Sequence, residues 1–332
     1  MLARSVLLIG TVASLAMASW LASAEEVNLP PNPYSVMENW AKLPNGQIWG
    51  EVIGVEMDPD GESVWVFDRC GPTGCMDPIG SKINPIHKFD RDGKLITSFG
   101  AGVFNWPHGF FVDGEGNVWA TDGIGVNGKG NTVFKFSPDG KLSMMLGRPG
   151  VAGSGQDTFN RPSDVLVGPN GDIFVADGHG DKSNARIVKF TWDGKFIKAW
   201  GREGSAPGEF DVPHGLAMDS RERLFVADRS HNRIQIFDQD GRFLEQWKQF
   251  GRPSGLYIDR HDTLYVADSQ SGEKYNVPFR HGIRIGSASD GHVTAFIAVS
   301  GPAMPESLAA DDHGNIFGGF VETRTLKKYV KN

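Results

Sequence analysis

The stretch PHGLAMDSRERLFVADRSHNRIQIFDQDGRF, from Pro213 to Phe243, decides the fold of this chain. It contains three short apolar runs, at residues 216–218, 224–227 and 233–237, and a fourth run begins at Phe243. The runs are separated by turns rich in Asp and Gly, and none of them has a helical period. Four short runs joined by tight turns are typical of a single four-stranded antiparallel sheet.

The same unit recurs along the chain, with copies that begin at residues 52, 107, 162, 213, 253 and 305. Repeats of this length made of four strands indicate a β-propeller, because one blade cannot bury both of its faces alone. The sixth copy stops after its third run, so we expect an N-terminal strand, near residues 47–50, to complete it. The sequence therefore predicts an all-β fold, a six-bladed β-propeller over residues 46–332 that an N-terminal strand closes.

The N-terminal residues predict export from the cytoplasm. Residues 1–24 hold Arg4, an apolar run and the small-residue stretch 22–24, which is the pattern of a secretory signal peptide. The alternative, a membrane anchor, fits less well because the run is short and ends in a cleavage-type motif. Residues 25–45 are expected to be a lead-in segment before the propeller. We expect a periplasmic or extracellular monomer with no membrane span after removal of the signal peptide.

The chain carries a net charge of -7, so it offers no basic field for nucleic acid or anionic lipid. Its two cysteines, Cys70 and Cys75, enclose a short loop. In an oxidising compartment a disulfide between them is the leading interpretation. A metal site is the weaker one, because no second cysteine pair or adjacent histidine completes it.

Alignment of the six copies brings the second residue of each into one column, called here the axial column: Ile53, His108, Ser163, His214, Ser254 and Glu306. The innermost strand of a blade lines the central channel, so this column is expected to face the axis. His108, His214 and Glu306 belong to alternate blades, which lie a third of a turn apart. Two imidazoles and a carboxylate suit Zn²⁺ with an open fourth position, and also Fe²⁺. The alternative for either histidine alone is a structural role.

A second column closes the second run of the first five copies with Asp, which we interpret as a turn or cap device without chemistry. Three residues that follow these aspartates depart from the Gly or Ser of the pattern: Arg69, His179 and Arg229. An arginine at the channel mouth can hold a substrate carboxylate, and a histidine can move a proton near neutral pH. The alternative is that each is a solvated charge at the rim. The other six histidines are interpreted as surface or structural residues: His87, His231, His261, His281, His292 and His313.

The chain resembles peptidyl-α-hydroxyglycine α-amidating lyase, within the wider group of NHL-repeat propellers, over residues 105–247 and more loosely over 48–330. The specific matches are the two Pro-His-Gly motifs at 107–109 and 213–215, the segment 161–165, and the strand ends Asp177-Gly178 and Asp228-Arg229. The resemblance implies that His108 and His214 bind zinc and that Arg69 and Arg229 contact a carboxylate. It also implies removal of glyoxylate from an α-hydroxyglycine terminus, with metal polarisation of the hydroxyl and a base that takes a proton.

The chain departs from that family at three positions. The third zinc histidine falls on Glu306, which can still ligate. The aspartate that helps hold a structural calcium falls on Ser307, which argues against that ion. The catalytic tyrosine falls in the loop after Gly178, where His179 is the nearest candidate for the base.

These observations lead to one main functional hypothesis and two alternatives. The main one is a metal-dependent lyase that cleaves a C–N or C–O bond in a small or peptidic substrate bearing a carboxylate. One alternative is a non-catalytic scaffold that binds a protein, peptide or glycan, with Trp106, Trp192 and Trp200 as candidate contacts. The other is a metal-dependent lactone or ester hydrolase on the same fold.

Overall fold

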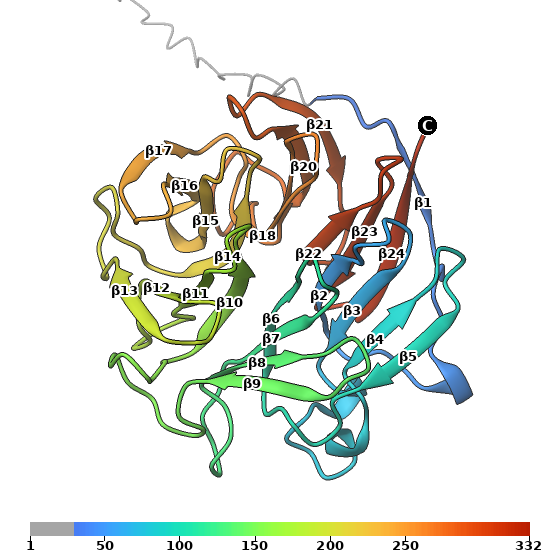
Figure 1. The fold of residues 1–332 in the computed structure, drawn as a ribbon. Helices are drawn as coiled ribbons and strands as arrows, with labels where there is room; N and C mark the ends of the chain where they lie inside the picture. The colour runs from blue at the N-terminus through green and yellow to red at the C-terminus, as the bar shows by residue number, and fades with distance from the viewer. Residues whose placement is uncertain (1–29) are drawn as a thin grey trace, which may run out of the picture.

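A computed structural model describes residues 30–332, and the predicted signal peptide, residues 1–24, lies outside the described residues. Six four-stranded antiparallel sheets surround a central axis (Figure 1), which confirms the six-bladed β-propeller. The inner strands contact one another in ring order, and the last contacts the first. Within residues 30–332, no helix has the length and apolar character that a membrane span needs.

Blades one to five use their strands in chain order from the axis outward, and blade six has β22, β23 and β24 followed by β1. The inner strands are β2 (Val52–Met57), β6 (Pro107–Val112), β10 (Pro162–Val167), β14 (Pro213–Met218), β18 (Pro253–Ile258) and β22 (Pro305–Ala310). The second strands are β3 (Val64–Asp68), β7 (Val118–Asp122), β11 (Ile173–Asp177), β15 (Leu224–Asp228), β19 (Thr263–Asp268) and β23 (Ile316–Phe320). The third strands are β4 (Ile86–Phe89), β8 (Thr132–Phe136), β12 (Arg186–Phe190), β16 (Arg233–Phe237), β20 (Gly282–Ser287) and β24 (Thr325–Lys331). The outer strands are β5 (Leu95–Phe99), β9 (Leu142–Leu146), β13 (Phe196–Trp200), β17 (Phe243–Trp247), β21 (Val293–Ala298) and β1 (Tyr34–Met37).

The core lies between neighbouring blades, because each sheet has two faces to cover. Second strands such as β15 are buried along their whole length, whereas the outer strand β9 is largely exposed. Phe67 of blade one and Phe110 of blade two illustrate the contact, with ring centroids 5.1 Å apart in a stacked arrangement. The continuous apolar runs of the second strands follow from this burial on both faces.

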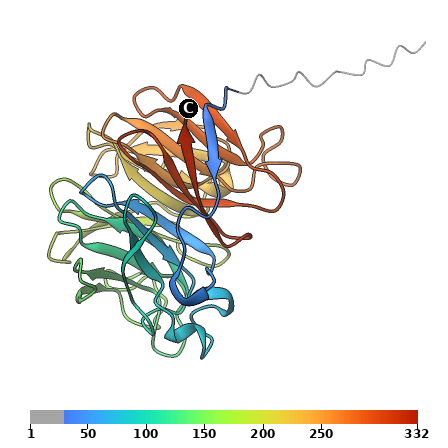
Figure 2. The same ribbon diagram turned by 90° about the vertical axis from the view of Figure 1, so that its right-hand side faces the viewer.

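The outer place of blade six is filled by β1, which pairs antiparallel with β24 from Tyr34 opposite Lys331 to Met37 opposite Lys328. Figure 2 shows this N-terminal strand beside the C-terminal one. The closing strand therefore lies at Tyr34–Met37 and not near residues 47–50, where the chain forms a 3₁₀ turn at Pro44–Gly46 and then an irregular segment. It comes from the segment 25–45 that was expected to be a lead-in. The reason for the difference is that β1 is short and its pairing partner lies at the far end of the chain.

Candidate metal centre at the axis

The axial column lies at the propeller axis. Its six members line one narrow cavity of about 30 Å³ in the central channel: Ile53, His108, Ser163, His214, Ser254 and Glu306. The pairing of each inner strand with its neighbour shifts register at this point, for example between Pro107 and Phe110 and between Pro213 and Leu216. A bulge of this kind re-aims a side chain, and bulges are common beside functional sites. Here the bulges turn the column toward the channel.

Backbone carbonyls of the next blade orient His108 and His214. His108 Nδ1 lies 2.7 Å from Ser163 O, and His214 Nδ1 lies 3.1 Å from Ser254 O. A carbonyl can only accept, so each Nδ1 carries the hydrogen and each neutral ring has its lone pair on Nε2. Histidines that bind metals usually donate their other N–H in this way.

The glycine of the first Pro-His-Gly motif allows this approach between blades. A Cβ on Gly109 would lie 2.6 Å from Ser163 O, so only glycine permits the two inner strands to come this close. The motif thus supplies both the His108 side chain and the close approach of the two inner strands that orients it.

Glu306 brings a carboxylate to the same place. Its Oε1 lies 3.3 Å from His214 Nε2 and 3.9 Å from His108 Nε2. Donor atoms held at about 2.1 Å from one tetrahedral ion are separated by about 3.4 Å, so these separations suit a shared ion. His108 Nε2 is buried and has no hydrogen-bond partner among the described residues, which is the condition expected of a ligand atom without its ion.

Burial keeps these imidazoles neutral. Burial lowers the pKa of both His108 and His214 well below the usual range. Neighbouring positive charge adds to the fall in pKa, chiefly that of Arg229 at His214. The Nε2 lone pairs are therefore available to a cation.

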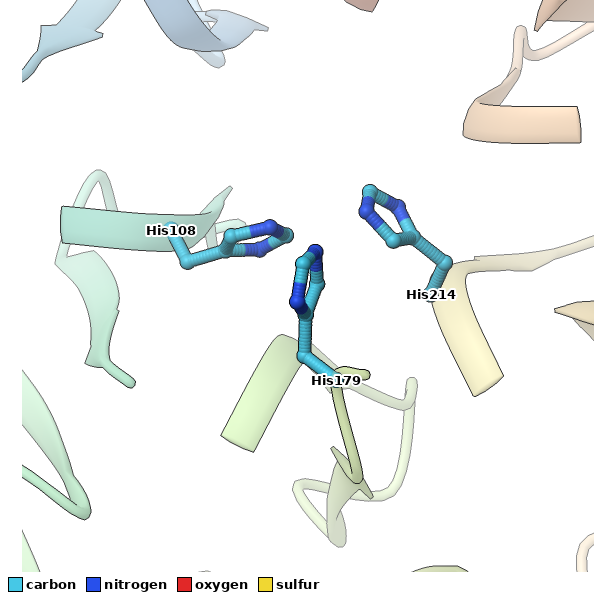
Figure 3. Close-up of side chains that lie close together, drawn as sticks. All are labelled: His108, His179 and His214. Atoms are coloured by element: carbon cyan, nitrogen blue, oxygen red, sulfur yellow. The ribbon is translucent and has the colours of Figure 1, made fainter. Parts of the chain in front are cut away.

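His179 and Arg229 lie in the same cluster. The candidate ligand atoms of His108, His179 and His214 are within 4.8 Å of one another, and Figure 3 shows the three rings converging from separate blades. Arg229 Nη1 is 2.8 Å from His214 Nε2, and its Nη2 is 3.3 Å from His179 Nε2. Burial also lowers the pKa of His179 well below the usual range. All three sequence-predicted metal ligands and two of the predicted catalytic residues thus lie together.

Arg69 reaches the cluster through Trp106. Its guanidinium lies 4.3 Å from the Trp106 ring centroid, and its Nε donates to Pro107 O at 3.1 Å. Trp106 in turn contacts His108 and His179, with centroid distances of 4.7 and 5.0 Å. Arg69 also forms an ion pair with Glu51. Beside them, a cavity of about 240 Å³ extends to the loop closed by the disulfide.

Sequence reasoning missed Glu51 and the site role of Trp106, although a signal for them existed. Both belong to the column one residue before each inner strand. Other members of that column also support the mouth. Arg161 Nη1 donates to His179 O at 3.2 Å, and Arg252 Nη1 donates to Arg229 O at 3.0 Å. The side chains just before the inner strands therefore fix the loops that carry the predicted catalytic residues.

The aspartates that end the second strands accept hydrogen bonds from backbone amides. Asp122 accepts from the amides of Asn105 and Trp106 at 2.8 and 2.6 Å. Asp68 accepts from the Gly50 and Cys70 amides, and burial raises its pKa to about 7. These contacts agree with the structural interpretation of the column. The disulfide between Cys70 and Cys75 is confirmed, with a Cα–Cα distance of 4.9 Å.

The channel also opens on the opposite face of the propeller. A cavity of about 540 Å³ lies there at the other ends of the inner strands, and its lining includes Trp119, Trp192 and Tyr257. The Trp192 side chain is 71% exposed. The protein thus has a polar mouth on one face and, on the other, a larger cavity that both aromatic and charged side chains line.

Comparison with known proteins agrees with the repeat architecture. The NHL repeat model matches residues 159–190 and 210–237. Human NHL repeat-containing protein 3 is 31% identical over 318 residues, which cover 90% of this chain and 84% of that protein. A probable peptidyl-alpha-hydroxyglycine alpha-amidating lyase of Caenorhabditis elegans is 40% identical over 143 residues, covering 42% of this chain and 39% of that protein. The chain thus matches about two fifths of the length of this lyase.

Among solved structures, a gluconolactonase of Xanthomonas campestris superposes with a TM-score of 0.61 and 16% identity, covering 92% of this chain and 97% of that one. At this identity the likeness shows the fold alone. The match to human NHL repeat-containing protein 3 extends over most of both chains and therefore shows the family. The chain therefore belongs to the NHL-repeat propellers that include NHL repeat-containing protein 3, and it is homologous to the amidating lyases.

Proposed function

We propose that the protein is an exported, metal-dependent lyase that cleaves a C–N or C–O bond in a small or peptidic substrate bearing a carboxylate. The observation that carries the proposal is the convergence of His108 Nε2, His214 Nε2 and Glu306 Oε1 on one point of the axis. Homology to the amidating lyases supports the reaction class. The disulfide supports an oxidising compartment.

The donor set fits a divalent transition metal such as Zn²⁺. Two neutral imidazoles have their N–H groups on carbonyls, and one nearly buried carboxylate balances the charge of the ion. His108, His214 and Glu306 would hold the ion. When bound, it would supply Lewis-acid polarisation of a substrate oxygen.

Arg69 and Arg229 would bind the substrate carboxylate. The Arg69 guanidinium lies over Trp106, and that of Arg229 contacts His214 and His179. Both side chains are largely buried, with 15% of Arg69 and 12% of Arg229 exposed. Charge-assisted hydrogen bonds to a carboxylate are strongest where water is excluded. Arg69 is held by Pro107 O and Trp106, so it is already oriented before substrate arrives. The cavity of about 240 Å³ beside it has room for the rest of the substrate.

Cleavage of an N-acyl-α-hydroxyglycine breaks the bond between the amide nitrogen and the α-carbon. The hydroxyl gives up its proton, the α-carbon becomes the aldehyde carbon of glyoxylate, and the departing nitrogen takes a proton. The sequence-based assignment gives His179 the role of the base. Its Nε2 lone pair lies among the metal-binding groups, and that position favours a different role, argued below.

The test is metal loading together with product formation. Mature protein purified without an affinity tag should take up one Zn²⁺ per chain and release glyoxylate from an N-acyl-α-hydroxyglycine. His108→Ala should abolish both, whereas the exposed control His261→Gln should change neither. Wild-type protein that takes up no Zn²⁺ at micromolar concentrations would overturn the proposal.

A non-catalytic scaffold is the second candidate, and two observations favour it. A relative of comparable extent is named for its repeats alone, and the opposite face has a 540 Å³ cavity beside the exposed Trp192. Such a scaffold should keep its binding when His108 and His214 are both alanine. The enzyme should lose product formation in that double variant, so the two functions give opposite results.

A further inference from the structure

His179 lies in a short loop that holds its ring against the axis. Gly178 and Gly180 flank it with φ angles of 152° and 82°, which let the chain turn inward and out again. Its carbonyl accepts a hydrogen bond from Arg161 Nη1, and its ring lies edge-on to Trp106. The loop is therefore fixed from the backbone side and from the ring side.

The guanidinium of Arg229 shows where the lone pair of His179 points. An arginine can only donate, so the contact of 3.3 Å from Nη2 to His179 Nε2 places a lone pair on that nitrogen. Nη1 of the same guanidinium contacts His214 Nε2 at 2.8 Å and lies 4.0 Å from Glu306 Oε1. One cation is thus surrounded by two imidazole lone pairs and a carboxylate.

We propose that His179 Nε2 is a fourth protein ligand of the metal ion that His108, His214 and Glu306 would hold. The inference rests on the proposed function for the existence of the metal centre. It deepens that function by assigning a ligand set of three imidazoles and one carboxylate.

The ligand role and the base role of His179 exclude each other. A base must keep its lone pair free in the loaded protein, whereas a ligand donates that same lone pair to the ion. The ring centroid of His179 is 4.6 Å from that of His108 and 5.1 Å from that of His214, nearly the separation of 4.7 Å between His108 and His214 themselves. His179 is therefore as close to the two axial histidines as they are to each other.

The experiment measures ion binding directly. Metal-free wild-type protein and three variants, His179→Gln, His179→Cys and His261→Gln, would be titrated with Zn²⁺ against a chromophoric chelator. Loss of a residue that only orients a ligand costs about 10–100-fold in affinity, so loss of a true ligand should cost at least about 100-fold in His179→Gln. His179→Cys retains a donor atom and should recover most of the affinity, and His261→Gln should match wild type.

Histidine-selective ¹⁵N spectra give a second readout that does not depend on activity. On addition of Zn²⁺, three Nε2 resonances should move in the wild type and two in His179→Gln. Thermal unfolding of each metal-free variant checks that the fold is intact.

The outcomes separate this inference from the proposed function. Wild-type protein that binds Zn²⁺ while His179→Gln binds equally well, with two resonances moving in both, would overturn the ligand role and leave the metal centre in place. Wild-type protein that binds no Zn²⁺ would overturn both.

Discussion

Replacement of Gly109 by alanine should force apart the inner strands of blades two and three and weaken the hold on His108. The added Cβ would lie 2.6 Å from Ser163 O and 2.8 Å from Asp164 Oδ1, whereas ordinary contacts begin at 3.4 Å. The Ser163 carbonyl must therefore retreat by about 0.8 Å. It accepts the His108 Nδ1 hydrogen at 2.7 Å, so a retreat along that bond would lengthen it to about 3.5 Å and end it.

The expected cost has two parts. Overpacking of this kind costs about 1–3 kcal/mol, and loss of the buried hydrogen bond adds about 1 kcal/mol to the fall in the free energy of unfolding. Because His108 loses the partner that orients it, Zn²⁺ affinity should fall about 10–100-fold.

Urea unfolding followed by tryptophan fluorescence and chelator competition for Zn²⁺ would measure the two effects. The matched control is Gly114→Ala on the same blade, because a Cβ there meets no atom within 4 Å. Gly109→Ala and Gly114→Ala with equal stability and equal Zn²⁺ affinity would refute the reasoning. Lower stability with unchanged Zn²⁺ affinity would refute the link between strand spacing and the orientation of His108.

Three further predictions concern the scaffold. Burial lowers the pKa of His87 from 6.5 to about 3. Below pH 6.5 the unfolded chain therefore binds a proton that the folded protein does not, and the free energy of unfolding falls as the pH is lowered. From pH 7 to pH 5 this group should lower the free energy of unfolding of the wild type by about 2 kcal/mol. Urea unfolding at the two pH values should show a fall that is smaller by this amount in His87→Phe; equal falls in both proteins would contradict a lowered pKa of His87. Replacement of Cys70 and Cys75 by alanine should lower the free energy of unfolding by roughly 2 kcal/mol, from the closure entropy of so short a loop, and an unchanged urea midpoint would count against it. A chain that begins at residue 38 lacks β1 and should melt several degrees below one that begins at residue 30; equal melting temperatures would show that the pairing with β24 adds nothing.

The blade repeat and the axial column could be predicted because both depend on local pattern. Short runs with a fixed order of turns repeat in the sequence, and alignment of the copies places His108, His214 and Glu306 at one level without any knowledge of packing. In the structure, Glu306 Oε1 lies 3.3 Å from His214 Nε2 and 3.9 Å from His108 Nε2. The position of a residue within its own blade thus predicted which residues of different blades lie together at the axis.

The remaining features depend on contacts between segments that are distant in sequence. Trp106 lies beneath the Arg69 guanidinium only after blades one and two have packed together, whereas the ion pair of Glu51 with Arg69 is local to the β2–β3 hairpin. The contact of Arg229 with His179 joins residues 50 positions apart, through side chains whose conformations no local pattern determines. The closing strand β1 was misplaced for the same reason, since its pairing partner is β24.

The sheet that contains both β1 and β24 also sets an order of assembly during synthesis. Tyr34 lies in the first strand of the described residues, and its partner Lys331 lies in the last one. Blades one to five have all their strands contiguous in sequence, so each can form as soon as it has been translated. Ring closure must wait until β24 has been translated, and until then β1 presents unpaired backbone groups to any other strand edge nearby.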